Sequence, residues 1–259
     1  MNILITAGGT AEKIDEVRRI SNMATGRLGS LIADTLLSME GTSITYLCSE
    51  DALIPQNNRA KILRIDNVQN LKLTLEKLLE EQIFDAIIHS MAISDYTVKY
   101  SAASEELEKF LANSLSQNNT DINNQKQLLA LLHEALSEYT GQQNSPKISS
   151  DIEQLFLCLE KTPKIIKLFK QLQPEAVLVG FKLLAGAKEC DLLQAASKLM
   201  KDNKCDFVLA NDKRDINEDR HAGILLGSDQ TKQYLYTKQE IANAISRSVV
   251  HRLMTAEWR

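Results

Sequence analysis

The stretch "ITAGGTAEKIDEVRRISNMATGRLGSLIADTL", residues 5–36, begins an α/β unit but contains an unusually long connection. The apolar run Met1–Ala7 predicts a buried strand, and Gly8-Gly9-Thr10 predicts the turn that ends it. The next helical pattern starts only near Thr25, and its apolar face consists of Leu28, Leu31, Ile32, Thr35 and Leu36. The connection is therefore about seventeen residues long, whereas such loops usually have about 2 to 6. Either the elements are assigned wrongly here or the loop has a function.

Apolar runs and helical patterns alternate along most of the remaining chain. Strands are expected at 43–48, 60–65, 85–96, 151–163, 176–184 and 205–212, and helices at 68–82, 164–173 and 190–203. Residues 221–236 predict a hairpin with its turn near Gly227-Ser228-Asp229, and residues 238–254 predict a closing amphipathic helix. This alternation is typical of a parallel sheet covered by helices on both faces.

Residues 101–150 interrupt the pattern. Two polar helical patterns, at 103–115 and 124–139, are followed by a stretch rich in turn-forming residues at 140–151. We expect a projecting helical excursion with a mobile flap at 141–150, where little would hold the chain in a packed core. The predicted fold class is therefore α/β, a Rossmann-like parallel sheet with flanking helices, a late β-hairpin and this excursion. All of it is expected to form a single domain over 1–259.

Composition limits the classes of function. The chain has 259 residues and a net charge of -4 from 30 basic and 34 acidic residues mixed along it, so neither nucleic acid nor a membrane surface is an expected partner. It has no signal-like N-terminus and no apolar run long enough to span a membrane, and a cytoplasmic location is expected. The four cysteines lie without CxxC spacing in or beside apolar segments, which predicts buried, reduced thiols: Cys48, Cys158, Cys190 and Cys205.

Small and polar residues end four of the expected strands. They are Gly8-Gly9-Thr10, the segment 90–95, Gly180-Phe181-Lys182 and Ala210-Asn211-Asp212. Ligands of open parallel sheets bind beyond the carboxyl ends of the strands, so these segments are candidates for one site. Gly8 and Gly9 would let a phosphate approach the backbone, although a simple tight turn explains them equally well. The sequence has neither GxGxxG nor GxxxxGK[ST].

Single polar residues add further candidates, each with a plain structural alternative. Asn22 can hold an amide or phosphate through its side chain, or can bond its own turn. Asp95 can orient a ribose or cation, or can cap a turn. Lys147 can neutralise phosphate from a closing loop, or can be an ordinary surface lysine. The arginines Arg18, Arg19 and Arg27 can bind phosphate or simply face solvent.

No residue pattern predicts a hydrolase or a zinc enzyme. The four histidines show no ligand spacing, and neither GxSxG nor HExxH is present. His89 lies within an apolar strand pattern and is expected to be a core histidine with a hydrogen-bond partner.

Taken in order, these segments resemble phosphopantothenate–cysteine ligase, an enzyme of coenzyme A biosynthesis. The resemblance rests on the stretch 5–29 and on "MAISDY", "PKIS", "KTPKII", "VGFKLL", "VLAND" and "LLGSD", and so covers most of the chain outside 101–145. It implies a reaction of 4'-phosphopantothenate with a nucleoside triphosphate, CTP or ATP with Mg²⁺, which gives an acyl-nucleotidylate that L-cysteine then attacks. It also implies a long first loop that wraps the substrate, a homodimer and a free-standing ligase whose decarboxylase partner is a separate protein.

The resemblance also implies site residues. Asn22 would hold the acyl intermediate with Ala92 nearby, and Asp95 would contact the nucleotide. Lys147 would meet the triphosphate, Phe181 would line the base pocket, and the Gly8-Gly9-Thr10 turn would face the nucleotide. Weaker transfers are Lys198, Lys201 and the segment 160–163.

Two departures leave the nucleotide open. The flap reads Lys147-Ile148-Ser149-Ser150 where many bacterial members have Lys-x-Lys-Lys, and the strand end reads Gly180-Phe181-Lys182-Leu183 where they have a Gly-Phe-Ala type. Both look closer to the ATP-preferring eukaryotic members. The rival interpretations are an NAD(P)-binding oxidoreductase or epimerase-like protein, for which Glu50 is the only acid available at the end of the second strand, and a non-enzymatic nucleotide sensor.

Overall fold

The structure is a computed structural model of the chain and describes residues 1–118, 124–141, 147–217 and 220–256. Contacts divide the chain into two compact units. The first contains Met1–Thr10, Ser21–Ser94 and Pro163–Arg259, and the second contains Ala11–Ile20 and Asp95–Thr162. The single domain expected over 1–259 stays a prediction.

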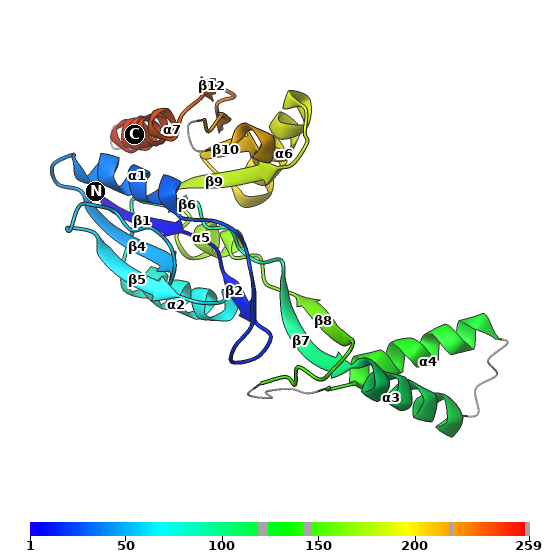
Figure 1. Cartoon of the computed structure of the whole chain (residues 1–259). Helices are drawn as coiled ribbons and strands as arrows, with labels where there is room; N and C mark the ends of the chain where they lie inside the picture. The colour runs from blue at the N-terminus through cyan, green and yellow to red at the C-terminus, as the bar shows by residue number, and fades with distance from the viewer. Residues whose placement is uncertain (119–123, 142–146, 218–219, 257–259) are drawn as a thin grey trace. The chain divides into compact units, whose positions relative to one another are not determined.

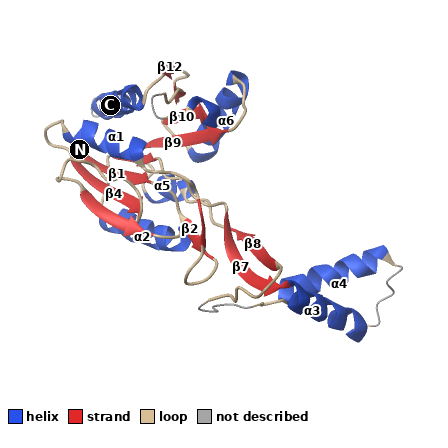
Figure 2. Ribbon diagram, in the orientation of Figure 1, coloured by secondary structure: helices blue, strands red, loops and turns tan. Residues whose placement is uncertain are grey.

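The first unit is built on a mostly parallel sheet of eight strands, in the order β12-β11-β10-β9-β6-β1-β4-β5. Figure 2 draws the strands in red. The six parallel strands are β1 (Asn2–Ala7), β4 (Ser43–Ser49), β5 (Lys61–Ile65), β6 (Ala86–His89), β9 (Val177–Leu184) and β10 (Phe207–Asp212). The late hairpin, β11 (Gly223–Gly227) and β12 (Lys232–Leu235), continues the sheet antiparallel. The chain builds outward from β1 to β5 and then returns to β6 on the other side of β1. This is the order of a doubly wound sheet, which confirms the Rossmann-like prediction and places its switch point between β1 and β6.

Helices cover both faces of this sheet (Figure 1). Along β1, Ile3, Ile5 and Ala7 pack in the cluster that contains α1 (Arg27–Leu37) and α7 (Lys238–Ala256). Leu4 packs in the opposite cluster with α2 (Val68–Glu81), α5 (Ile166–Leu172) and α6 (Glu189–Asn203). Successive strand side chains point to opposite faces, so a strand buried on both must be apolar throughout. Burial of β1 on both faces therefore explains the continuous apolar run at the N-terminus.

The second unit contains an antiparallel ribbon of β7 (Tyr96–Ala103) and β8 (Leu155–Lys161), and the helices α3 (Ser104–Gln117) and α4 (Gln125–Glu138). The strand expected at 151–163 therefore pairs in this ribbon and not in the main sheet. The strand expected at 85–96 is likewise wrong in extent, since β6 ends at His89 and β7 starts at Tyr96. Most side chains of β8 are exposed or half-buried, unlike those of a central parallel strand. The two helical patterns of the excursion are confirmed.

The long first connection is not irregular. It contains two short paired strands, β2 (Ala11–Lys13) and β3 (Arg19–Ser21), before α1 begins at Arg27. A short 3₁₀ helix, η1 (Lys213–Asp215), follows β10. None of the described helices is long and apolar enough to cross a membrane.

All four cysteines are free thiols. Cys48 and Cys205 are buried as predicted, whereas Cys158 is half-buried and Cys190 is exposed. The prediction of a buried thiol is wrong for Cys190, because this residue lies in the exposed first turn of α6.

Candidate functional site

The loops that follow β1 and β6 are joined by backbone hydrogen bonds at the switch point. Gly9 and Ala92 form a parallel bridge. Ala92 N donates to Gly8 O over 2.8 Å, and Thr10 N donates to Ala92 O over 3.1 Å. The structure thus brings together four predicted site residues, Gly8, Gly9, Thr10 and Ala92, at the carboxyl ends of the two strands that flank the switch point.

Asn22 joins this group through both its backbone and its side chain. Its backbone N donates to Thr10 O over 3.3 Å, and its side-chain Nδ2 donates to Ala92 O over 3.1 Å. The side chain therefore bonds the loop after β6 and not its own turn. Asn22 is exposed, so the amide that is anchored on one side remains open to a ligand on the other.

Thr10 and Ser94 link the same two loops beneath the surface. Thr10 is buried, and its Oγ1 accepts a hydrogen bond of 2.9 Å from Ser94 N and donates one of 3.2 Å to Ser94 Oγ. Ser94 was not predicted as a site residue on its own. Its place within the segment 90–95 was the available signal.

Glycines make the strand-to-helix connection possible at this point. Gly8 has φ +86°, and a Cβ there would lie 2.7 Å from Ala52 Cβ. A Cβ on Gly29 would lie 2.6 Å from Ala7 Cβ and 2.8 Å from Ser90 Oγ, so the first turn of α1 packs directly on the end of β1. The spacing Gly26-x-x-Gly29 matches the second half of a dinucleotide-binding fingerprint, and a long insertion separates it from Gly8-Gly9. This split pattern was not predicted, because the insertion hides it from a search for a continuous GxGxxG.

The candidates on β9 and β10 differ in their place on the strand. Gly180-Phe181-Lys182 does not end its strand as expected, because β9 continues to Leu184, whereas Asp212 does end β10. Phe181 is half-buried and packs against the core cluster under α1 and α7. Asp212 is buried, and its Oδ2 accepts a 2.6 Å hydrogen bond from Ala187 N. Hydrogen bonds from the Arg214 side chain and backbone hold the pKa of Asp212 well below its usual range. The lining role expected for Phe181 stays a prediction.

Two predicted site residues belong to the second unit. Asp95 is exposed at the start of the ribbon, where its carbonyl oxygen accepts a 3.1 Å hydrogen bond from Thr162 N. Lys147 is exposed and precedes Ile148, which is only 2% exposed. The expectation that 141–150 lacks packing residues is therefore wrong at Ile148, while residues 142–146 lie outside the described chain.

The side chains of Asp15 and Arg18 hydrogen-bond the backbone of Ile148. The Asp15 carboxylate accepts hydrogen bonds from the backbone N–H groups of Val17, Arg18 and Ile148, and the Arg18 guanidinium contacts it at 3.0 Å. Burial acts to raise the pKa of Asp15, but the hydrogen bonds from Ile148, Val17 and Arg18 and the charge of Arg18 outweigh it and lower this pKa to about 2. Arg18 is thus engaged with Asp15, and Asp15 is ionised at neutral pH.

Lys198 and Lys201 are exposed residues in the last turns of α6, at the end that leads into the start of β10. They are not among the residues gathered at the carboxyl ends of the strands, and their roles stay predictions. His89 is a core histidine as expected. Its Nδ1 lies 2.7 Å from Thr6 Oγ1, and burial lowers its pKa to about 4.

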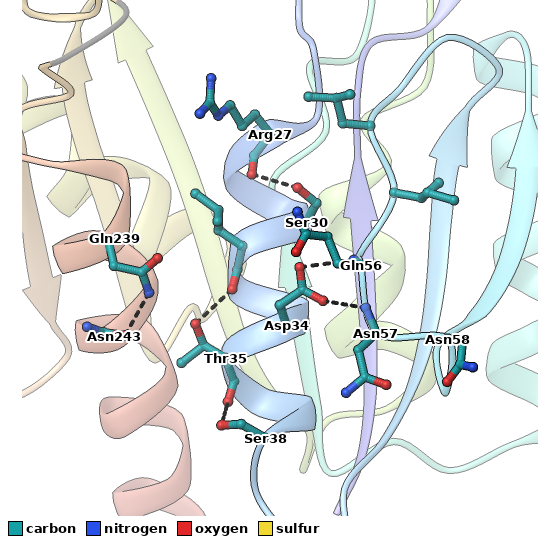
Figure 3. Close-up of a pocket in the computed structure, with 13 residues that line it drawn as sticks. Arg27, Ser30, Asp34, Thr35, Ser38, Gln56, Asn57, Asn58, Gln239 and Asn243 are labelled. Carbon is teal, nitrogen blue, oxygen red and sulfur yellow. Dashed lines mark hydrogen bonds between the residues drawn. The ribbon is translucent and has the colours of Figure 1, made fainter.

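A groove of about 1040 Å³ lies in the first unit between α1, the loop 53–58 and the start of α7 (Figure 3). Within it Asp34 accepts hydrogen bonds from Gln56 N and Asn57 N over 3.1 and 2.9 Å. Arg27, one of the candidate phosphate ligands, lines this groove, whereas none of the other predicted site residues does. Within residues 1–118, 124–141, 147–217 and 220–256, no three His, Cys, Asp or Glu side chains gather as a metal site would require.

The strand order and the joined loops define the class as a doubly wound α/β protein whose polar loops meet at the switch point. The sequence model of one family, the DNA/pantothenate metabolism flavoprotein C-terminal domain, matches residues 1–128 and 111–253. The chain belongs to this family.

Individual relatives agree with this assignment. A crystal structure described as the DNA/pantothenate metabolism flavoprotein from Streptococcus pneumoniae is 35% identical, with a TM-score of 0.79 over 97% of this chain and 99% of that one. The coenzyme A biosynthesis bifunctional protein CoaBC of Thermococcus kodakarensis is 28% identical over 94% of this chain. This chain covers 49% of that protein, and it spans about half the length of the curated relatives that it matches from end to end.

A more distant structure shares the fold. It is described as the Cab2 mutant H337A in complex with phosphopantothenate-cysteine, and it is 16% identical with a TM-score of 0.67 over 98% of this chain and 86% of that one.

Proposed function

We propose that the chain is a ligase that joins 4'-phosphopantothenate to L-cysteine through an acyl-nucleotidylate, in coenzyme A biosynthesis. The observation that carries the proposal is the exposed Asn22 amide, anchored on Ala92 O at the switch point of a chain that belongs to this family. The names of the CoaBC relative and of the Cab2 complex support the pathway and the substrates.

The reaction has two steps in this proposal. A carboxylate oxygen of 4'-phosphopantothenate attacks the α-phosphorus of the nucleoside triphosphate, and pyrophosphate leaves. The amine of cysteine then attacks the acyl carbon, the nucleoside monophosphate leaves, and the amine loses a proton as the amide forms. Both steps depend mainly on positioning and on stabilisation of negative charge, so no protein nucleophile is required.

The site residues have distinct parts in these steps. Asn22 hydrogen-bonds the acyl group, and the Gly8-Gly9 turn admits a close approach of ligand to backbone. Lys147 neutralises charge on the triphosphate as pyrophosphate forms. We assign Asp95 and Phe181 to the nucleotide, as the family resemblance implies.

Mg²⁺ would enter with the triphosphate. This ion usually keeps several waters and binds phosphate oxygens with only one or two protein carboxylates, so an all-protein cage is not needed. Parallel assays with CTP and with ATP would decide which of the two nucleotides the chain uses. We also propose a homodimer and a cytoplasmic location.

The alternative of an NAD(P)-binding enzyme is not favoured by the end of β4. A ribose-binding acid is expected there in such enzymes, but Ser49 faces the glycine turn, and Gly9 N donates to its Oγ over 3.2 Å. Glu50 follows and is exposed.

One assay tests the proposal. Pyrophosphate release is measured with 4'-phosphopantothenate, cysteine and either CTP or ATP, beside a titration with NADPH and NADH. We expect release that depends on phosphopantothenate with at least one nucleotide. Nicotinamide cofactor binding without any pyrophosphate release would contradict the proposed ligase.

A further inference from the structure

Ile148 is held at both of its backbone groups by one pair of side chains. Asp15 Oδ2 accepts a 3.1 Å hydrogen bond from Ile148 N, and Arg18 NH2 donates a 2.6 Å hydrogen bond to Ile148 O. These two contacts reproduce with side chains what a neighbouring strand would provide with its backbone. They connect parts of the second unit that lie 130 residues or more apart in sequence.

The turn at 14–18 holds Asp15 and Arg18 in place for these contacts. Ile14 N and Asp15 N donate to Arg18 O over 2.9 and 3.3 Å, which closes the segment 14–18. Arg18 Nε and NH2 meet Asp15 Oδ2 at 3.1 and 3.0 Å, and the Asp15 side chain is fully buried. Because the carboxylate is ionised and already satisfied by local donors, it presents a fixed acceptor to Ile148.

Lys147 is the residue directly before this contact. Consecutive Cα atoms are about 3.8 Å apart, so a fixed Ile148 restricts where the Lys147 side chain can start. The buried Ile148 side chain adds an apolar anchor to the two hydrogen bonds.

The same device occurs a second time, in the first unit. Asp212 Oδ2 accepts from Ala187 N over 2.6 Å, and Arg214 NH2 donates to Ala187 O over 3.0 Å. A lysine also adjoins this residue, although Lys188 follows Ala187 whereas Lys147 precedes Ile148. An Asp–Arg pair that holds both backbone groups of a residue beside a lysine is thus a repeated feature of this chain.

We propose that Asp15 and Arg18 form a clamp on Ile148, and that Asp15 is a positioning residue that places Lys147 for nucleotidylate formation. The positioning role rests on the proposed function, whereas the clamp itself does not. In this proposal the long first loop has a structural role, because its turn at 14–18 fixes Ile148, the residue that follows Lys147.

The clamp is tested by hydrogen exchange of the Ile148 amide without ligands. Asp15→Asn removes the charge and should speed this exchange at least about tenfold, as expected when a backbone hydrogen bond opens locally. Asp206→Asn is the matched control, because the Asp206 carboxylate also accepts a backbone N–H, from Leu178, and pairs with Lys170, but lies in the other unit. Exchange at Ile148 should not change in this control.

Arg18→Gln provides a second variant should Asp15→Asn not fold. It removes the donor to Ile148 O while leaving the buried carboxylate, and it should also speed exchange at Ile148. Wild-type exchange at Ile148 in a folded variant of either residue would overturn the clamp.

The positioning role is tested by a double-mutant cycle on single-turnover pyrophosphate release. Asp15→Asn alone should slow release about tenfold, but should add less than about twofold in a Lys147→Gln background, because its effect passes through Lys147. Independent losses that multiply would overturn the positioning role. A wild-type protein without any pyrophosphate release would contradict the proposed ligase, and the exchange measurement would still decide the clamp.

Discussion

The Asn22 side chain offers one donor that an aspartate cannot supply. Its Nδ2 donates to Ala92 O, and a carboxylate at this position would face that carbonyl and the ligand phosphate with negative charge. We expect Asn22→Asp to fold normally but to lose about a hundredfold in overall turnover, or about 3 kcal/mol. Pyrophosphate release in a single turnover without cysteine should persist, because the variant forms the intermediate but does not pass it on.

The matched control for this prediction is Asn58→Asp. Asn58 is exposed in the groove beside α1, so the same chemical change should leave turnover unchanged. Wild-type turnover by a correctly folded Asn22→Asp protein would remove Asn22 from the site.

Lys147 tests the charge requirement of the first step. Lys147→Gln keeps most of the side-chain stem and removes the positive charge, so it should slow nucleotidylate formation by one to two orders of magnitude, about 1.4 to 2.7 kcal/mol. The measurement is single-turnover pyrophosphate release with CTP and ATP in parallel. Lys77→Gln, an exposed change on α2, is the control. If Lys147→Gln released pyrophosphate at the wild-type rate, Lys147 would be an ordinary surface residue.

His89 predicts a pH dependence of stability. Burial lowers its pKa to about 4 from an ordinary value of 6.5, so between these values the unfolded state binds more protons than the folded state. The free energy of unfolding should therefore fall as pH decreases from about 6.5 to about 4, by up to about 3 kcal/mol from this residue. His221, whose pKa burial also lowers to about 4, adds to the same window.

Urea unfolding at pH 7 and pH 5 measures this effect. A His89→Gln variant should be less stable at pH 7 but should show a smaller difference between the two pH values. An equal difference in both proteins would exclude His89 as its source.

At the scale of elements, the packing of α1 on β1 depends on Gly29. Alanine would gain up to about 1 kcal/mol of helix propensity. A Cβ placed 2.6 Å from Ala7 Cβ overpacks a buried contact, which costs about 1 to 3 kcal/mol. Gly29→Ala should therefore lower the free energy of unfolding by about 1 to 2 kcal/mol. Urea unfolding is the measurement, and Ser197→Ala on the exposed face of α6 should change stability by less than about 0.5 kcal/mol. A stabilised Gly29→Ala protein would show that the helix can move away.

The sequence predicted most of the main sheet, because its strands carry apolar runs set by burial on both faces. It failed where pairing depends on distant residues. β8 resembles a sheet strand locally, but only its partner β7 decides that it joins a separate ribbon. The paired strands β2 and β3 are three residues each, too short for a periodic signal.

The candidate site, like the fold, could be predicted only in part from the sequence. Gly8, Gly9, Thr10 and Ala92 meet as expected because parallel strands carry their ends to one edge. The bond from Asp15 to Ile148 spans 133 residues, and no local pattern indicates it. The roles proposed for Asn22 and Lys147 come from the resemblance to a family, because the residue types alone left them open.

At the scale of the whole molecule, we predict a homodimer. The hairpin strand β12 lies at an edge of the sheet, and Tyr234 on it is 50% exposed, so a second copy can cover this edge. Light scattering should give twice the chain mass of 29.0 kDa at assay concentration. Tyr234→Lys should weaken the dimer, whereas Phe156→Lys on the β7–β8 ribbon is the comparison. A fully active monomer would contradict the dimer, and dissociation by Phe156→Lys alone would move the interface to the ribbon.

The second unit consists of two separate pieces, Ala11–Ile20 and Asp95–Thr162, so the chain passes between the units four times. During synthesis both pieces leave the ribosome before β9, β10, β11 and β12 exist. The second unit can therefore fold around Ile148 while β6 still lacks its neighbour β9 and half of the main-sheet strands are missing. A nascent chain that stops near Thr162 would contain every residue of the second unit but only half of the main-sheet strands. The edge of β6 that later pairs with β9 would expose unpaired backbone groups to chaperones until translation supplies β9.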